Sequence, residues 1–220
     1  MAHTETRAVR MQGVRKKILD TAKKLFSEQG YKKTTIRQIV LESGITSGSI
    51  YNLFENKDAV FSAIIDELMD NTVRLVERDF AEETAINQYA AIMAVEWFAI
   101  AKDSVLRELY YEAYAEPILF ENVLRRHMEI ETRFLADVEE ERTEEEVARM
   151  VLTKGAMLSY IEAFSFQRPM NTEAIRKELI NLTFGNLGIK KKDIKEIMRF
   201  MDSIEEKCTD IAHQILVLEA

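Results

Sequence analysis

The sequence contains few of the residues that interrupt or cross-link a chain. Only 2 prolines and 7 glycines occur among 220 residues, so helices can run for long stretches without a break. Cys208 is the single cysteine, which excludes an intramolecular disulfide and fits a reducing, cytoplasmic compartment. No apolar run reaches the roughly 18 residues of a transmembrane helix, and the N-terminus lacks the apolar core of a secretory signal.

Motifs of several enzyme classes are missing as well. The sequence has no HExxH, no Cys/His cluster spaced for zinc, and no GxxxxGK[ST] or GxGxxG phosphate loop. The histidines His3, His127 and His213 lie far apart along the chain. The acidic run from Glu139 to Glu146 is better explained by exposed helix ends than by paired catalytic carboxylates. We therefore expect no catalytic site, metal ion or cofactor.

Charge is distributed unevenly along the chain. The net charge is −8, yet residues 1–60 hold 11 Lys and Arg against 6 Asp and Glu. The remaining residues hold 19 basic against 32 acidic side chains. This asymmetry suggests that one part of the chain contacts a polyanion and the other does not. Chance placement of charges on solvated faces explains the same counts equally well.

Apolar residues recur every three or four positions, which predicts an all-α fold without strands of useful length. Residues 1–11 are expected to form a disordered arm. A helix over 12–29 ends at Gly30, a C-cap glycine, and Thr143 with Glu146 matches a capping box. The expected helices number about nine to ten and cover about 12–29, 35–43, 47–54, 57–80, 85–101, 104–114, 118–140, 144–167, 172–184 and 192–218.

The stretch from Thr34 to Phe54 contains two short helical segments joined by Ser43-Gly44-Ile45-Thr46. Helices of about eight residues are not stable alone, so these must pack on their neighbours. Two helices joined by a tight turn with glycine are the sequence form of a helix-turn-helix. Apolar residues that can close its small core are Val14, Ile18, Leu25, Phe26, Ile36, Ile39, Val40, Ile45, Ile50, Leu53 and Phe54.

The second short helix leaves small hydrogen-bonding residues for its outer surface. Such a thin helix fits the major groove of DNA, where Ser, Thr and Asn can bond bases or phosphates. Arg37 and Lys57 add positive charge beside it, and Lys16, Lys17, Lys23 and Lys24 add diffuse attraction. An ordinary helical hairpin with a polar face remains the alternative. The outward residues are Thr46, Ser47, Gly48, Ser49, Tyr51 and Asn52.

The same residues resemble a known family. The runs Ile18–Phe26, Gly30-Tyr31, Thr34–Ile39 and Ser43–Asp58 are similar to the N-terminal domain of TetR-type transcriptional regulators, over roughly residues 12–70. The sequence departs from the family at Leu53, where many members have His or Tyr.

The resemblance implies an all-helical, Ω-shaped homodimer. A three-helix DNA-binding domain would occupy residues 12–72, with the helix-turn-helix at about 35–54, and a larger helical domain for effector binding and dimerisation would occupy 73–220. The resemblance also implies phosphate contacts from Thr35, Tyr51 and Lys57. It implies base-facing positions at Arg37, Thr46, Ser47, Ser49 and Asn52, with Gly48 allowing close approach.

The C-terminal part gives weaker indications. The helices at about 144–167 and 192–218 carry continuous apolar stripes, which two subunits could combine into a four-helix interface or which one subunit could use in its own core. Several aromatic and polarizable residues could line an effector pocket or simply fill the core. These candidate pocket residues are Met93, Trp97, Tyr110, Tyr111, Tyr114, Phe120, Tyr160 and Phe164.

The sequence therefore favours a dimeric regulator that binds double-stranded DNA and no membrane. In this hypothesis the protein is a repressor that a small apolar or aromatic effector releases from a palindromic operator. One alternative is an all-helical DNA-binding regulator without a small-molecule effector, controlled by a protein partner. The other is a helical enzyme or partner-binding protein whose N-terminal hairpin is only structural.

Overall fold

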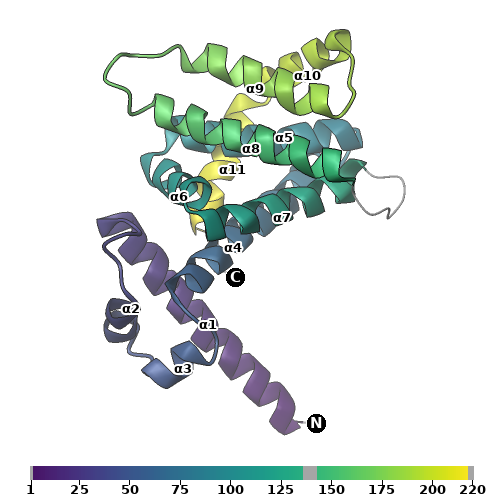
Figure 1. Cartoon of the computed structure of the whole chain (residues 1–220). Coiled ribbons are helices and arrows are strands. Elements are labelled where there is room, and N and C mark those ends of the chain that lie inside the picture. The colour runs from purple at the N-terminus through teal and green to yellow at the C-terminus, as the bar shows by residue number, and fades with distance from the viewer. Residues whose placement is uncertain (1, 136–142, 218–220) are drawn as a thin grey trace. The chain divides into compact units, whose positions relative to one another are not determined.

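The chain folds entirely into helices in the part that the structure describes, which confirms the all-α prediction (Figure 1). The computed structural model describes the backbone of residues 2–135 and 143–217, with side chains from residue 9 to residue 215 outside that gap. Its helices are α1 (Ala2–Gln29), α2 (Ile36–Ser43), α3 (Ser47–Tyr51), α4 (Lys57–Asp79), α5 (Ala85–Lys102), α6 (Ser104–Ala115), α7 (Pro117–Leu135), α8 (Glu144–Ala163), α9 (Thr172–Asn186), α10 (Lys191–Ser203) and α11 (Glu205–Val217).

Several expected boundaries are wrong, and the helices expected over 47–54 and 144–167 end at Tyr51 and Ala163. The disordered arm expected over residues 1–11 is helical from Ala2, because Ala, Glu, Arg, Met and Gln in this stretch favour a helix and no proline interrupts it. The single helix expected over 192–218 is two helices that meet at Ile204. The Ser203 hydroxyl donates to the Phe200 carbonyl at 2.7 Å beside this break, a local bond that competes with regular helix bonding.

Other local predictions are confirmed by the helix ends. Gly30 follows α1 with φ 82°, and Gly44 follows α2 with φ 64°. Thr143 and Glu146 form the expected capping box at the start of α8. The expected end of the 118–140 helix, part of the acidic run, and the last residue of the 192–218 helix lie outside the described residues.

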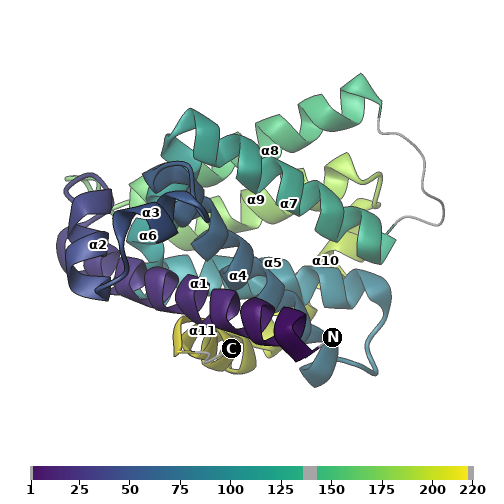
Figure 2. The same cartoon turned by 90° about the horizontal axis from the view of Figure 1, so that it is seen from below.

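Contacts divide the chain into two compact units, and the division falls between Glu67 and Leu68, inside α4. The N-terminal unit contains α1, α2, α3 and the first half of α4. In Figures 1 and 2, α2 and α3 lie together beside α1. The C-terminal unit contains the rest of α4 and helices α5 to α11. The expected domain boundary between residues 72 and 73 remains a prediction.

The core of the N-terminal unit is built from aliphatic and aromatic side chains. Ile18, Ile39 and Ile50 bring α1, α2 and α3 together, and all three have no exposed surface. Phe26, Tyr31 and Phe61 form a ring cluster with centroids 4.8 to 5.6 Å apart. This cluster packs α1 and the connector after it against α4, which stabilises the core of the N-terminal unit.

Helix α5 is the central element of the C-terminal unit. Every residue from Tyr89 to Ile100 is buried, and the helix packs against α6, α7, α10 and α11. A helix that is apolar on nearly all sides must be surrounded by other elements. Glu96 is the one charged residue in this buried run. In the described part of the chain, no helix has both the length and the apolar character needed to cross a membrane.

We expect Ile50→Ala to lower the free energy of unfolding by about 2–5 kcal/mol, because it removes a fully buried side chain and leaves a cavity behind α3. Leu41→Ala is the matched control, since Leu41 on α2 is 80% exposed. It should change stability by less than about 0.5 kcal/mol. Urea unfolding followed by circular dichroism measures both values, and equal losses in the two variants would contradict the buried position of Ile50.

Candidate functional site

Helix α2 is fixed at both ends by local bonds. The Gln38 amide donates to the Thr35 hydroxyl at 3.3 Å, and the Thr35 amide donates to the Gln38 side-chain oxygen at 2.8 Å. At the other end, the Gly44 amide donates to the Val40 carbonyl at 3.1 Å. These caps satisfy backbone groups that a short helix leaves unpaired. Arg37, in the first turn between the caps, is exposed.

Helix α3 has only five residues and begins after the N-cap residue Thr46. The Ser49 amide donates to the Thr46 hydroxyl at 3.3 Å, and the two side-chain oxygens lie 2.9 Å apart. Ile50 faces the core and is fully buried, while Phe54 after the helix is 6% exposed. The helix is therefore held by one cap and by apolar contacts on a single side.

The opposite side of α3 is open to solvent. Thr46, Ser47, Gly48 and Asn52 are exposed, and Tyr51 is 57% exposed. Ser49 is half-buried. Apart from Ser49, the small polar residues singled out in the sequence are therefore exposed, as are Thr35 and Arg37. Their contacts with DNA remain predictions.

Lys57, the first residue of α4, occupies a more constrained place than the sequence suggested. Its ammonium donates to the Tyr31 carbonyl at 2.9 Å and lies 3.8 Å from the centre of the Tyr31 ring. The Tyr31 hydroxyl donates to Asp58, the next residue of α4. Tyr31 therefore anchors the start of α4.

Two of the basic residues expected to add diffuse attraction are partly neutralised. Lys23 pairs with Glu67 at 2.9 Å, and Arg15 reaches the same carboxylate at 2.9 Å, which ties α1 to α4. Lys24 lies 3.8 Å from Glu42. Exposed pairs of this kind contribute about 0–1 kcal/mol, so these residues fix local geometry more than they stabilise the fold.

In the described part of the chain, the candidate pocket residues lie in several different surroundings. Met93, Trp97, Tyr110, Tyr114 and Tyr160 are buried, whereas Tyr111, Phe120 and Phe164 are half-buried. Tyr111 lines an open groove of about 500 Å³ between α6 and α8. Tyr160 and Phe164 pack edge to face with centroids 5.3 Å apart. Only Met93 and Tyr110 of this set line a small cavity inside the C-terminal unit.

That cavity of about 10 Å³ borders a buried polar cluster, which we define as Glu96, Tyr114, His127 and Lys154. The Tyr114 hydroxyl donates to Glu96 Oε1 at 2.7 Å. The Lys154 ammonium lies 3.7 Å from Glu96 Oε2 and 3.5 Å from Met93 Sδ. Burial would raise the pKa of the Glu96 carboxyl, but Lys154 and His127 outweigh it and hold that pKa at about 2. The cluster therefore contains a buried ion pair.

His127 is not isolated in space, although it is isolated in the sequence. Its Nε2 lies 3.6 Å from Glu96 Oε1 and 3.3 Å from the Tyr114 oxygen. Burial, reinforced by the nearby Lys154 charge, lowers the pKa of His127 against the opposing effect of Glu96, which favours the neutral imidazole. Sequence reasoning missed the roles of Glu96, His127 and Lys154. A charged residue within an otherwise apolar helical stretch, as in AVEWF and LTKGA, is the signal that could have found two of them.

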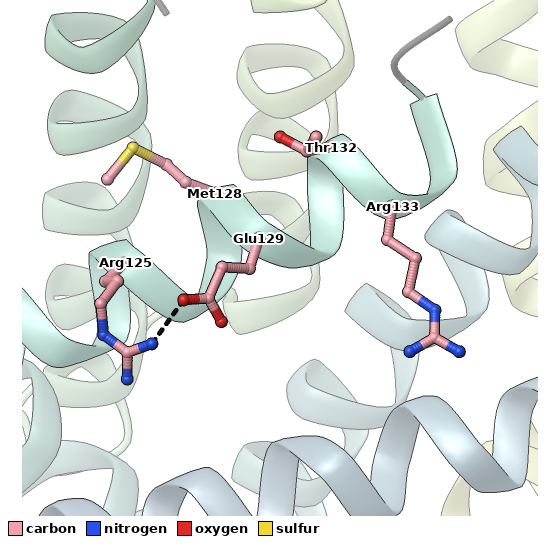
Figure 3. A pocket seen from close by; sticks show the side chains of 5 residues that line it. All are labelled: Arg125, Met128, Glu129, Thr132 and Arg133. Carbon is pink, nitrogen blue, oxygen red and sulfur yellow. Dashed lines mark hydrogen bonds and ion pairs between the residues drawn. The ribbon is translucent and has the colours of Figure 1, made fainter. Parts of the chain in front are cut away.

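A second hollow lies on the outer surface of α7 (Figure 3). It has a volume of about 470 Å³ and is lined by Arg125, Met128, Glu129, Thr132 and Arg133. Figure 3 shows Arg125 and Glu129 turned toward each other in an ion pair. Because all five lining residues belong to one helix, this hollow is an open surface and does not enclose a ligand.

The two helices expected to form a subunit interface differ in exposure. Val147, Val151 and Leu152 on α8 are 37%, 39% and 68% exposed, and Leu182 on the adjoining α9 is 37% exposed. By contrast, the stripe expected over 192–218 is buried within its own unit, where Cys208 and Ile211 of α11 pack on the α5 side. Sequence periodicity alone could not distinguish these two uses of an apolar stripe.

Known proteins match this chain mainly in its N-terminal part. Residues 18–64 match the family described as bacterial regulatory proteins, tetR family. The HTH-type transcriptional repressor Rv1474c of Mycobacterium tuberculosis is 32% identical over 85 residues, which cover 39% of this chain and 46% of that protein. The fatty acid metabolism regulator protein of Bacillus subtilis is 25% identical over 83 residues, or 38% and 43% of the two chains. The chain thus spans less than half the length of these curated relatives.

A solved structure extends the likeness of fold to most of the chain. The full-length TylP protein, a tetR regulator from Streptomyces fradiae, superposes with a TM-score of 0.53 at 15% identity. The superposition covers 91% of this chain and 98% of that one, so the two share the same helical fold. The helix-turn-helix of α2 and α3 lies within the matched residues 18–64. The N-terminal unit is therefore similar to the DNA-binding part of the tetR family of bacterial regulatory proteins over residues 18–64.

Proposed function

We propose that this protein is a sequence-specific DNA-binding transcriptional regulator, and that it acts as a repressor. The observation that carries the proposal is the accessible outer surface of α3, which bears hydroxyl and amide groups and is braced from behind by Ile50. A single α-helix fits the major groove, which is about 12 Å wide. The match of residues 18–64 to the tetR family supports the same function, as does the similar protein named as a transcriptional repressor.

Within this proposal, the residues near α3 have two roles. Thr35, Tyr51 and Lys57 contact phosphates, which positions the helix without reading sequence. Arg37, Thr46, Ser47, Ser49 and Asn52 face the bases, and Gly48 lets the helix backbone approach closely. The positive charge of Lys57 attracts a phosphate oxygen.

We also propose that the protein is a homodimer that binds a palindromic operator. One helix of five residues reads only a few base pairs, and two-fold symmetry doubles the site. The exposed apolar residues of α8 and α9 support a four-helix interface between subunits. We assign the interface to α8 and α9, because the apolar side chains of α10 and α11 are already buried by packing within the C-terminal unit.

We further propose that a small molecule bound in the C-terminal unit weakens DNA binding. Met69 and Thr72 of α4 line the cavity beside the polar cluster. The same helix begins at Lys57, next to the helix-turn-helix. A ligand that shifts α4 would therefore favour a conformation that binds DNA poorly, provided that it binds this conformation more tightly.

Replacing Tyr51 and Arg37 should separate positioning from base reading. Tyr51→Phe removes one hydroxyl bond to a phosphate, and we expect about tenfold weaker binding to every duplex. Arg37→Ala should cost about 1–3 kcal/mol at the preferred base pair and so relax the sequence preference. Fluorescence anisotropy on duplexes selected from a random library measures both effects. Lys195 is an exposed residue of α10, so Lys195→Ala is the control for the loss of a positive charge elsewhere on the surface. Wild-type affinity and preference in both test variants would refute the assigned roles.

Salt should weaken DNA binding in a defined way. Each phosphate neutralised by Lys or Arg contributes a slope of about −0.9 to the logarithm of the binding constant against the logarithm of salt concentration. We expect Lys57→Ala to reduce this slope by about one relative to wild type. The Lys195→Ala control should keep the wild-type slope. Binding that does not respond to salt would count against a DNA-binding function.

The proposed interface predicts the effect of a charge on α8. Leu152→Glu should convert the dimer to a monomer, because a buried carboxylate without a partner costs several kcal/mol at the interface. Leu41→Glu, on the exposed surface of α2, should leave the dimer intact. Analytical ultracentrifugation gives the masses. A Leu152→Glu variant that sediments as the wild type does would place the interface elsewhere.

A further inference from the structure

We infer that the cavity beside the polar cluster takes a small, neutral molecule that carries a hydroxyl group on an apolar body. This inference rests on the effector response proposed above and assigns it a class of ligand. The cavity lies inside the C-terminal unit and is lined by residues of α4, α5, α6 and α7. Its polar side is formed by Glu96, Tyr110 and His127, and its apolar side includes Met69, Met93 and Ile130.

The charges of the cluster exclude a charged ligand. Glu96 already has a counter-charge in the Lys154 ammonium, 3.7 Å away, and both side chains are at most 5% exposed. A ligand carboxylate placed here would face the charges of Glu96 and of Glu131, which also acts on His127 and Lys154, and a ligand ammonium would compete with Lys154 for Glu96. Burying such a charge costs several kcal/mol, whereas a neutral polar group costs little once it is hydrogen-bonded.

The unused hydrogen-bonding atoms of the cluster are acceptors. The Tyr114 hydroxyl donates to Glu96, so its oxygen can accept the His127 Nε2 hydrogen, which leaves Nδ1 of the neutral ring as an acceptor. Neither His127 Nδ1 nor Glu96 Oε2 has a hydrogen-bond partner in the described part of the chain. Buried polar atoms without partners are uncommon. A ligand hydroxyl supplies the missing donor.

The apolar side of the cavity is lined in part by side chains that can change conformation when a ligand binds. Met69 of α4 and Met93 of α5 both border it, and methionine has an unbranched side chain with three rotatable bonds. The cavity of about 10 Å³ holds no more than one water molecule, so a ring or a short alkyl chain can enter only by displacing these two side chains. Because Met69 and Thr72 belong to α4, a ligand seated here bears on the helix that begins at Lys57.

The inference can be tested on the full-length protein with three matched probes, benzyl alcohol, benzoate and benzylammonium at neutral pH. Calorimetry should show that benzyl alcohol binds at least about tenfold more tightly than either charged probe. His127→Phe removes the Nδ1 acceptor and keeps a ring, and we expect about tenfold weaker binding of the alcohol. The control is His213→Phe, because His213 is an exposed residue of α11. Glu96→Leu combined with Lys154→Met removes the Glu96 acceptor and its counter-charge together and should also weaken binding of the alcohol.

Several outcomes would overturn the ligand class. Tighter binding of benzoate or benzylammonium, or no binding of any probe, would contradict a neutral hydroxyl ligand. Unchanged alcohol binding in both the His127→Phe and the double variant would show that the cluster is not the site.

A DNA-binding assay with and without benzyl alcohol separates a failure of the ligand site from a failure of the proposed function. If the alcohol binds but DNA affinity does not change, the ligand site stands and the effector response fails. If the protein does not bind DNA at all, the regulatory function fails alone.

Discussion

The surface proposed to read DNA depends on a helix that cannot exist by itself. Helix α3 has five residues, fewer than an isolated helix needs in water, and its hydroxyl-bearing side is turned away from the core. Its position therefore comes from the buried side, where Ile50 contributes about 1.5–3 kcal/mol by leaving water. The ring cluster of Phe26, Tyr31 and Phe61 supports the same unit at the start of α4. Residues that never face DNA thus determine whether those that do are correctly placed.

The C-terminal unit is governed by a different constraint, a charge placed in the middle of its most buried helix. Glu96 lies in a run of α5 that has almost no contact with water, so it requires a partner of opposite charge. Lys154 from α8 supplies that partner, and Tyr114 and His127 add polar contacts from α6 and α7. Removing one partner of a buried ion pair costs about 3–5 kcal/mol, so these four helices are held to one arrangement. Glu96 and His127 of this cluster also form part of the polar side of the adjoining cavity.

Helix α4 contributes residues both to the N-terminal unit and to the lining of the cavity. This helix starts at Lys57, whose side chain is held by Tyr31, and farther along it contributes Met69 and Thr72 to the lining of the cavity. The anchor at Tyr31 and the cavity lining thus both involve residues of the same helix of 23 residues. In the proposed function, this shared helix is the element through which a bound ligand would affect DNA binding.

The sequence by itself determined the features that depend on neighbours within about four residues. Helical periodicity, the glycines at 30 and 44, and the capping box of Thr143 and Glu146 are all local, because helix bonds join residues three or four apart. The family resemblance likewise identified the outward residues of α3. Only the tertiary structure decided which apolar stripes are buried and which are exposed, since α8 and α11 have similar patterns and different neighbours. It alone also brought Glu96, His127 and Lys154 together, because an ion pair between distant helices depends on packing and has no fixed spacing in the sequence.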